Sequence, residues 1–169
     1  MSKYSIASLA ALTLSAALIM PLLGKDAKDQ GFAGKWVLDK KTSHGSEPMT
    51  ELRQDIKQSG SDFLIQSRFA EPPSGVAPLV YLGIMTSTLN LKTDGQETKN
   101  QIGPYMFVSK TTLEGNKLTT DWASTINGDP VEGKWVRTLS EDAKHLSLEI
   151  TQSSTKGQKG DATLNFNRK

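Results

Sequence analysis

The side chains best suited to chemistry in this chain are Arg137 and two tryptophans, Trp122 and Trp135, which lie in consecutive segments of alternating polar and apolar residues. In an extended strand every second side chain points to the same face, so Trp135 and Arg137 share one face, and Trp122 lies on the strand before. A guanidinium on an inner face most often meets a carboxylate, from another side chain or from a ligand such as a fatty acid. The pattern therefore predicts two indoles beside one buried cation.

Two alternatives to this arrangement stay open at the level of sequence. The aromatic residues could fill a solid core, because small barrels are just wide enough either to pack shut or to hold one small ligand. A pairing shifted by one residue, with a bulge at Gly133, would turn Arg137 to solvent. Several polar residues on predicted inner faces favour a cavity, since burying them without partners costs free energy. These residues are Gln54, Gln58, Ser67, Ser109, Thr120 and Ser124.

Catalytic chemistry has little support in the residue pattern. The chain contains no cysteine, which excludes thiolate chemistry and disulfides. Its two histidines, His44 in a predicted loop and His145 at a predicted strand start, form neither a metal spacing nor a nucleophile elbow. We therefore predict no catalytic residue, no metal and no cofactor, and an isomerase or hydrolase that uses polar groups of a cavity ranks third among the hypotheses.

Short alternating segments separated by turns must position these residues. The predicted strands cover residues 32–40, 51–58, 63–69, 79–91, 98–102, 105–114, 117–126, 131–139, 145–153 and 162–169. Regular hairpin spacing without a helical crossover excludes a parallel α/β fold. The sequence predicts an all-β fold, an up-and-down antiparallel β-barrel of about eight to ten strands.

The two ends of this pattern resemble the lipocalins and the wider calycin group. Gly34, Lys35 and Trp36 form a G-x-W on the first strand, a meander of hairpins follows, and Arg168 lies on the last strand. The resemblance, to a bacterial-type exported lipocalin-like domain, implies that Gly34, Trp36 and Arg168 close one end of the barrel, with Trp36 against Arg168. The T-D-Y-type turn of typical lipocalins is absent, and Thr93-Asp94-Gly95 is at most an echo of it.

The first 24 residues are predicted to be a signal peptide, because Lys3 precedes an apolar stretch over residues 6–23. A poor cleavage site leaves an uncleaved membrane anchor as the alternative. Residues 25–169 are the right length for a single domain, which we expect to be secreted or periplasmic. The net charge is +2, of which Lys3 contributes one, so the charge argues against nucleic acid as a partner.

Together these features predict a monomeric exported protein that binds a small hydrophobic or amphipathic ligand, such as a fatty acid, in a barrel cavity. Residues 72–85 are expected to form the mouth or flap of the barrel. The alternative is a solid barrel that docks a protein partner through the apolar segment over residues 76–85. The predicted ligand contacts are Trp122, Trp135, Arg137, Phe107, Phe69, Tyr105 and Tyr81.

Overall fold

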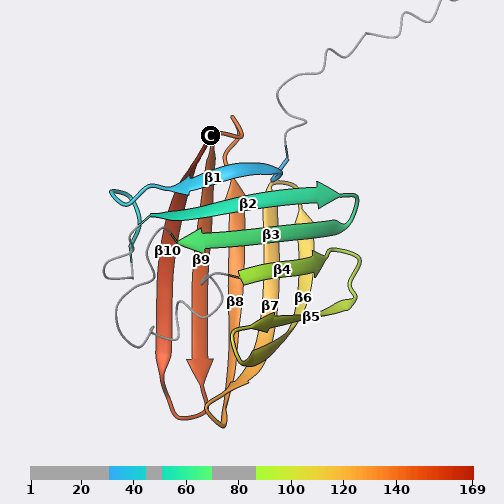
Figure 1. Cartoon of the computed structure of the whole chain (residues 1–169), viewed down its shortest axis with the longest axis vertical. Coiled ribbons are helices and arrows are strands. Elements are labelled where there is room, and N and C mark those ends of the chain that lie inside the picture. Colours follow the sequence, from blue (N-terminus) through green and yellow to red (C-terminus); the bar gives the residue numbers. More distant parts are fainter. Residues whose placement is uncertain (1–30, 45–50, 70–86) are drawn as a thin grey trace, which may run out of the picture.

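The computed structural model of the chain describes residues 31–44, 51–69 and 87–169, and the structural statements below concern these residues. Ten strands follow one another along the described part, which contains no helix (Figure 1). The strands are β1 Gly34–Leu38, β2 Leu52–Ser59, β3 Asp62–Phe69, β4 Ser87–Lys92, β5 Glu97–Ile102, β6 Tyr105–Glu114, β7 Lys117–Ile126, β8 Asp129–Leu139, β9 His145–Ser154 and β10 Lys159–Arg168.

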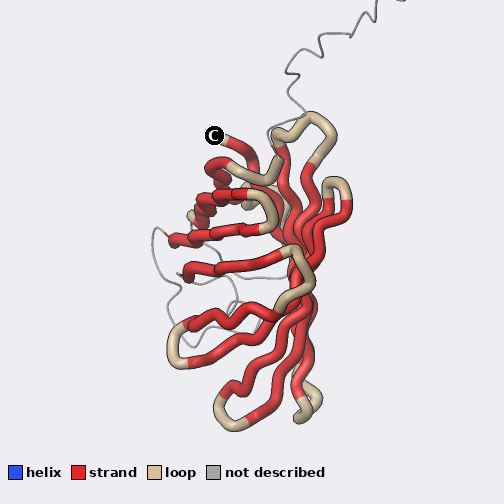
Figure 2. The backbone as a smooth tube through the Cα atoms, turned by 90° about the vertical axis from the view of Figure 1, so that its right-hand side faces the viewer, coloured by secondary structure: helices blue, strands red, loops and turns tan. Residues whose placement is uncertain are grey.

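All ten strands belong to one antiparallel sheet with the order β4-β3-β2-β1-β10-β9-β8-β7-β6-β5. The first and last strands are neighbours, because Trp36 of β1 pairs with Arg168 of β10. Figure 2 shows the long strands forming one wall, from which the shorter strands extend at a steep angle on one side. The sheet therefore curls into an almost closed up-and-down barrel, which confirms the predicted fold class and strand number.

The two edge strands, β4 and β5, do not pair through a backbone ladder, but a side chain of β5 hydrogen-bonds to the backbone of β4. Asn100, buried on β5, accepts a hydrogen bond from the Asn90 N–H through Oδ1 at 2.6 Å and donates to the Asn90 carbonyl through Nδ2 at 3.0 Å. These two bonds replace the pair that two opposite residues exchange in an antiparallel ladder. We call this contact between β4 and β5 the seam.

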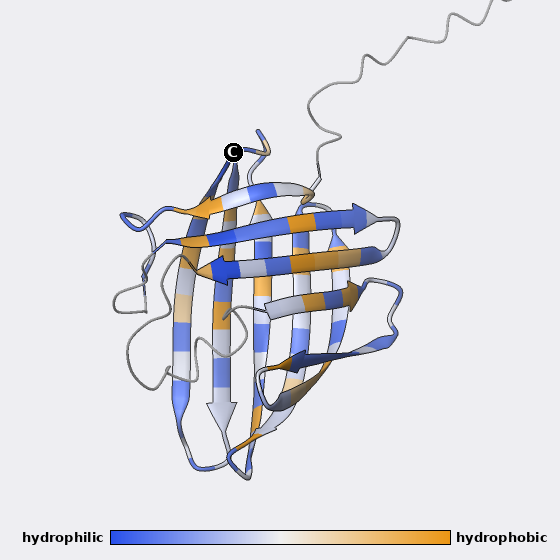
Figure 3. Ribbon diagram, viewed as in Figure 1, coloured by the Kyte–Doolittle hydropathy of each residue, from blue (hydrophilic) through white to orange (hydrophobic). Residues whose placement is uncertain are grey.

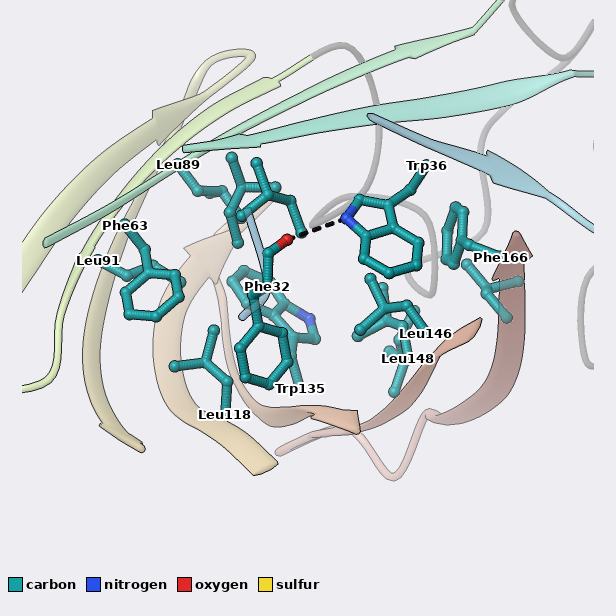
Figure 4. Packing of buried hydrophobic residues seen from close by; sticks show 14 of the residues in the cluster. Phe32, Trp36, Phe63, Leu89, Leu91, Leu118, Trp135, Leu146, Leu148 and Phe166 are labelled. Atoms are coloured by element: carbon teal, nitrogen blue, oxygen red, sulfur yellow. Dashed lines mark hydrogen bonds between the residues drawn. The ribbon is translucent and has the colours of Figure 1, made fainter. Parts of the chain in front are cut away.

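Alternation of side chains along each strand places the apolar residues inside the barrel, and this banding is visible on the ribbon (Figure 3). Phe32, which precedes β1, lies among buried side chains of both layers (Figure 4). Its ring meets Phe63 of β3 edge to face, with 6.0 Å between centroids. Met106, at 48%, is the one large apolar residue that is exposed in the described ranges. The alternating pattern thus buries nearly all large apolar groups.

Two strands of the long wall begin earlier than the sequence predicts. Asn127 and Gly128 form a two-residue turn with φ of 52° and 78°. This double positive φ is the signature of a type I′ hairpin, so the chain re-enters the sheet at Asp129 and not at residue 131. Pro130 accordingly pairs with Thr125 inside the ladder. The last strand likewise begins at Lys159, three residues before the predicted start.

Three predictions lie outside the described residues: the signal peptide over residues 1–24, the mouth segment over residues 72–85 with Tyr81, and the docking segment over residues 76–85. Of the predicted strand over residues 79–91, the described part begins at Ser87. Among the described residues there is no helix with the length and apolar character to cross a membrane.

Candidate functional site

Arg137 lies on the inner face of β8, where only 1% of its surface is exposed. Its neighbours across the ladder are Leu118 of β7 and Leu148 of β9, and both are fully buried. Burial lowers the pKa of the guanidinium to about 10, which still leaves it protonated at neutral pH. A charge surrounded by leucines is an expensive arrangement unless a partner of opposite charge compensates it.

No such partner is found for Arg137 within the described ranges. Its Nε and Nη1 atoms are buried and donate no hydrogen bond there. The three ion pairs found among these residues join other, exposed side chains. Arg137 therefore presents unused donor groups and a positive charge to the barrel interior, a combination that suits a bound carboxylate.

The pairing of β8 settles which face Arg137 occupies. β8 pairs with β7 from Asp129 to Thr138 and with β9 from Val131 to Leu139 without a bulge. The alternative with a bulge at Gly133 is therefore wrong. Gly133 is needed for another reason: a Cβ there would lie 2.6 Å from Cε2 of Trp122 and 2.6 Å from the Thr151 carbonyl oxygen. The missing side chain makes room for the Trp122 indole.

Three buried aromatic rings lie together on β6, β7 and β8. The ring centroids of Phe107 and Trp122 are 5.0 Å apart, those of Trp122 and Trp135 are 5.3 Å apart, and those of Phe107 and Trp135 are 6.2 Å apart. These separations lie in the range of favourable aromatic pairs. Arg137 follows Trp135 by two residues on the same face, so the structure brings four of the predicted contact residues to one wall of the barrel.

The remaining predicted contacts do not join this group. Phe69, at the end of β3, and Tyr105, at the start of β6, are half-buried and pack against the core. The Tyr105 hydroxyl already donates to Oδ1 of Asn127 at 2.7 Å, at the turn between β7 and β8. Gln58, expected to lie buried on the inner face, is exposed near the end of β2. That expectation was wrong.

Four of the predicted inner polar residues, Gln54, Ser67, Ser109 and Thr120, have hydrogen-bond partners on neighbouring strands, and the half-buried Ser124 donates to the Met106 carbonyl at 2.8 Å. Thr111 and Thr120 share a hydrogen bond of 3.0 Å, and so do Thr98 and Ser109. The Gln54 amide donates to the Ser67 hydroxyl at 3.1 Å.

Four further buried polar atoms have no partner in the described part of the chain, namely Oε1 of Gln54, Oγ of Ser87, Nε1 of Trp122 and Nε2 of Gln152. The sequence analysis did not select Ser87, Asn100 or Gln152. Alternation along β9 was the available signal for Gln152, because it shares a face with Leu148 and Ile150. Nothing local marked Asn100.

Trp36 and Arg168 form the centre of a separate, structural cluster. The guanidinium carbon of Arg168 lies 4.3 Å from the ring centroid of Trp36, a cation–π distance. The indole Nε1 of Trp36 donates to the Phe32 carbonyl at 3.0 Å. A Cβ on Gly34, whose φ is 147°, would lie 2.5 Å from Nη1 of Arg168, so only glycine fits beside the arginine.

Arg168 also ties three chain segments together through backbone carbonyls. Its Nε donates to Ala143 at 2.6 Å, its Nη1 to Ala33 at 2.6 Å and its Nη2 to Gly31 at 2.9 Å. Residues 31 and 33 precede β1, and residue 143 connects β8 to β9. The side chain therefore holds the entry to the first strand against the far wall of the barrel, and all three of its nitrogen atoms make structural hydrogen bonds.

Neither histidine belongs to a reactive cluster. Both are exposed; His44 pairs with Thr163 through its backbone, and Nδ1 of His145 lies 2.8 Å from Oδ1 of Asn167. Among the residues that the structure describes, no three His, Cys, Asp or Glu side chains gather where they could hold a metal ion.

A hollow of about 470 Å³ lies at the surface of β7, β8 and β9, and its lining includes Trp122, Gly133 and Gln152 beside outward-facing residues. Its rim carries Asp121 and Lys134, which form an exposed ion pair of 3.1 Å. Neither Arg137 nor Trp135 lines it. The exposed ion pair is satisfied by itself and solvated, so this hollow is a poorer candidate for a specific site than the unpaired groups inside the barrel.

The nearly closed up-and-down topology and the inward polar groups define an antiparallel β-barrel with polar side chains inside. No family model matches the chain, and no curated protein sequence matches it. Three solved structures share the fold, each over about four fifths of this chain. The secretory abundant heat soluble protein of Ramazzottius varieornatus is 10% identical, with 81% of this chain and 94% of that chain covered and a TM-score of 0.56.

The other two structures are similar at comparable levels. For the REP1-NXSQ fatty acid transporter the identity is 14%, the coverage 81% of this chain and 95% of that chain, and the TM-score 0.52. The fatty-acid-binding protein isolated from Manduca sexta is 15% identical, with 81% of this chain and 99% of that chain covered and a TM-score of 0.51. At such identities the likeness establishes the shared barrel fold alone.

Proposed function

We propose that this protein binds one small hydrophobic or amphipathic ligand with a carboxylate group, such as a fatty acid, inside the barrel. The observation that carries the proposal is Arg137, a buried cation with unused donors on a wall otherwise made of leucines and aromatic rings. The fatty-acid-binding protein and the fatty acid transporter that share the fold support the proposal by analogy.

In the proposed complex the ligand carboxylate accepts hydrogen bonds from the Arg137 guanidinium. Charge-assisted bonds of this kind are roughly twice as strong as neutral ones, and the low dielectric of the interior strengthens them further. The ligand chain lies against Trp135, Trp122 and Phe107, and each buried methylene contributes about 0.8 kcal/mol. Binding needs no proton transfer and no bond-breaking step, so we propose a binding protein and not an enzyme.

We further propose that the protein is exported as a monomer, secreted or periplasmic, and that residues 1–24 are its signal peptide. The support is the position of Lys3 before an apolar stretch over residues 6–23. The mass of the protein isolated from its own cells tests this: loss of about 24 residues supports removal of a signal, and the full-length mass supports the anchor.

The first experiment is native purification, extraction with organic solvent and mass spectrometry of the extract, followed by titration of a fatty-acid panel with tryptophan fluorescence. We expect a discrete copurified molecule, or saturable quenching that is strongly weakened in Arg137→Met. Lys134→Met is the matched control, because it removes an exposed cation from the same strand. An empty extract together with flat titrations would overturn the proposal and favour a solid barrel.

A further inference from the structure

Two unused hydrogen-bonding groups lie in one row of the inner wall, apart from Arg137. Nε1 of Trp122 on β7 and Nε2 of Gln152 on β9 are both buried and have no partner within the described ranges. Trp122 pairs with Gly133, and Gly133 pairs with Gln152, so the three residues form one cross-strand row. Their side-chain positions all face the interior.

Gly133, in the middle of the row, lets the two groups approach each other. The position of a Cβ on Gly133 is only 2.6 Å from Cε2 of Trp122, the ring atom bonded to Nε1. The indole N–H therefore extends across Gly133 toward β9. It lies within about one strand spacing, roughly 5 Å, of that strand, which carries Gln152. Any side chain at residue 133 would occupy this space.

The other neighbour of Trp122 in the row does not compete for the indole. Ser109 of β6 pairs with Trp122, but its hydroxyl shares a hydrogen bond of 3.0 Å with Thr98. The indole N–H and the Gln152 amide are thus the two polar groups of the row without a partner. A methylene chain lying over them would leave both unpaired, and an unpaired buried donor costs more than a hydrogen bond gains.

We infer that Trp122 and Gln152 form a second polar subsite that holds an oxygen atom along the ligand chain. The unpaired atoms of the row, Nε1 of Trp122 and Nε2 of Gln152, are both N–H donors, so the row suits an oxygen that accepts hydrogen bonds, from a keto or a hydroxyl group. The ligand class is then an oxygenated fatty acid, a carboxylate with a mid-chain oxygen. The inference rests on the proposed function, because it takes Arg137 as the partner of the carboxylate.

The spacing of the two subsites indicates where the oxygen lies on the ligand. Gly133 and Arg137 are four residues apart on β8, which corresponds to about 13 Å along an extended strand. A carboxylate at Arg137 and an oxygen at the Trp122–Gln152 row are therefore separated by a stretch of chain, which excludes oxygen next to the carboxyl group. Trp135 lies between the two subsites on the same face.

The test compares three probes of equal chain length: stearate, 12-hydroxystearate and 12-oxostearate. Dissociation constants are measured by calorimetry for the full chain and for Gln152→Leu and Trp122→Phe. We expect the wild type to bind the oxygenated acids roughly 5- to 10-fold more tightly than stearate, the value of about one net hydrogen bond. In Gln152→Leu and in Trp122→Phe, which keeps an aromatic ring beside Phe107, this preference should largely disappear.

Two controls separate the possible failures. Gln101→Leu removes an exposed amide from β5 and should keep the preference, whereas Arg137→Met should weaken all three probes by a similar factor and leave their ratio unchanged. Equal binding of the three probes to the wild type would overturn this inference and leave the proposed function standing, as expected if a water molecule fills the row. A preference that survives both Gln152→Leu and Trp122→Phe would also overturn it. Failure of every probe to bind would overturn the proposed function itself.

Discussion

Replacing Arg137 by methionine should make the ligand-free protein more stable while weakening its affinity for carboxylates. Burial lowers the pKa of the guanidinium to about 10, more than two units below its ordinary value. Since one pKa unit corresponds to about 1.4 kcal/mol, holding the charge in the barrel costs about 3 kcal/mol. Methionine has a similar length, carries no charge and adapts to irregular space, so Arg137→Met removes this cost without leaving a large cavity.

The expected gain is therefore up to about 3 kcal/mol in the free energy of unfolding at neutral pH, within the range seen when apolar groups replace buried charges. Urea unfolding of delipidated protein measures it as a higher midpoint with an unchanged slope. In the same variant, loss of a charge-assisted hydrogen bond, about 1.5 to 3 kcal/mol, should weaken carboxylate binding by roughly 10- to 100-fold.

The control for both measurements is Lys134→Met, which removes an exposed cation from the same strand. It should leave both the urea midpoint and the affinity for carboxylates nearly unchanged. The reasoning is refuted if Arg137→Met lowers stability by several kcal/mol and leaves fatty-acid affinity intact. That result would mean that Arg137 has a structural partner in the native protein and no role in recognition.

Three further predictions concern the frame of the barrel. Gly133→Ala should destabilise the protein by about 1 to 3 kcal/mol and change tryptophan fluorescence, because the new methyl group would overlap an indole and a backbone carbonyl; an unchanged urea midpoint would contradict this. Asn100→Leu should lower the free energy of unfolding by about 1 to 2 kcal/mol and speed hydrogen exchange of the Asn90 amide, since both hydrogen bonds of the seam are lost. Unchanged exchange at Asn90 would show that these two hydrogen bonds do not hold the seam. The Thr155 hydroxyl, 2.5 Å from the Asp129 carboxylate, lowers the pKa of Asp129 below its ordinary value of 3.8. The ionised carboxylate therefore stabilises the fold above that pH, and this contribution to the free energy of unfolding is lost as the pH falls below it. Thr155→Val should therefore flatten the acid side of the stability curve, and a curve parallel to that of the wild type would count against this bond.

Strand positions could be predicted from the sequence because side-chain alternation is a local property of an extended chain. β6 and β7 match the predicted ranges, since glycine and asparagine mark the turns on either side. The start of β8 was missed because Asp129 and Pro130 are typical turn residues. The ladder nevertheless continues through them, opposite residues of β7.

The candidate site could be predicted only in part. Alternation assigned Trp135 and Arg137 to one face, but which face points inward depends on the pairing of the whole sheet. Gly133 was taken as a possible bulge, although its function is to admit the indole of a neighbouring strand. The row that joins Trp122 to Gln152 could not be recognised, because the two residues are brought together by the pairing of β7, β8 and β9.

By itself the sequence determined the all-β class and the up-and-down order of hairpins, and it made Arg137 a candidate for the interior. Only the tertiary structure decided that Arg137 is buried without a partner among residues 31–44, 51–69 and 87–169, that Asn100 holds the seam and that the polar groups inside fall into paired and unpaired sets. The physical reason is the range of the interactions. Alternation and turn geometry act over a few residues, whereas satisfaction of a buried polar group depends on side chains that only sheet closure brings within hydrogen-bond distance.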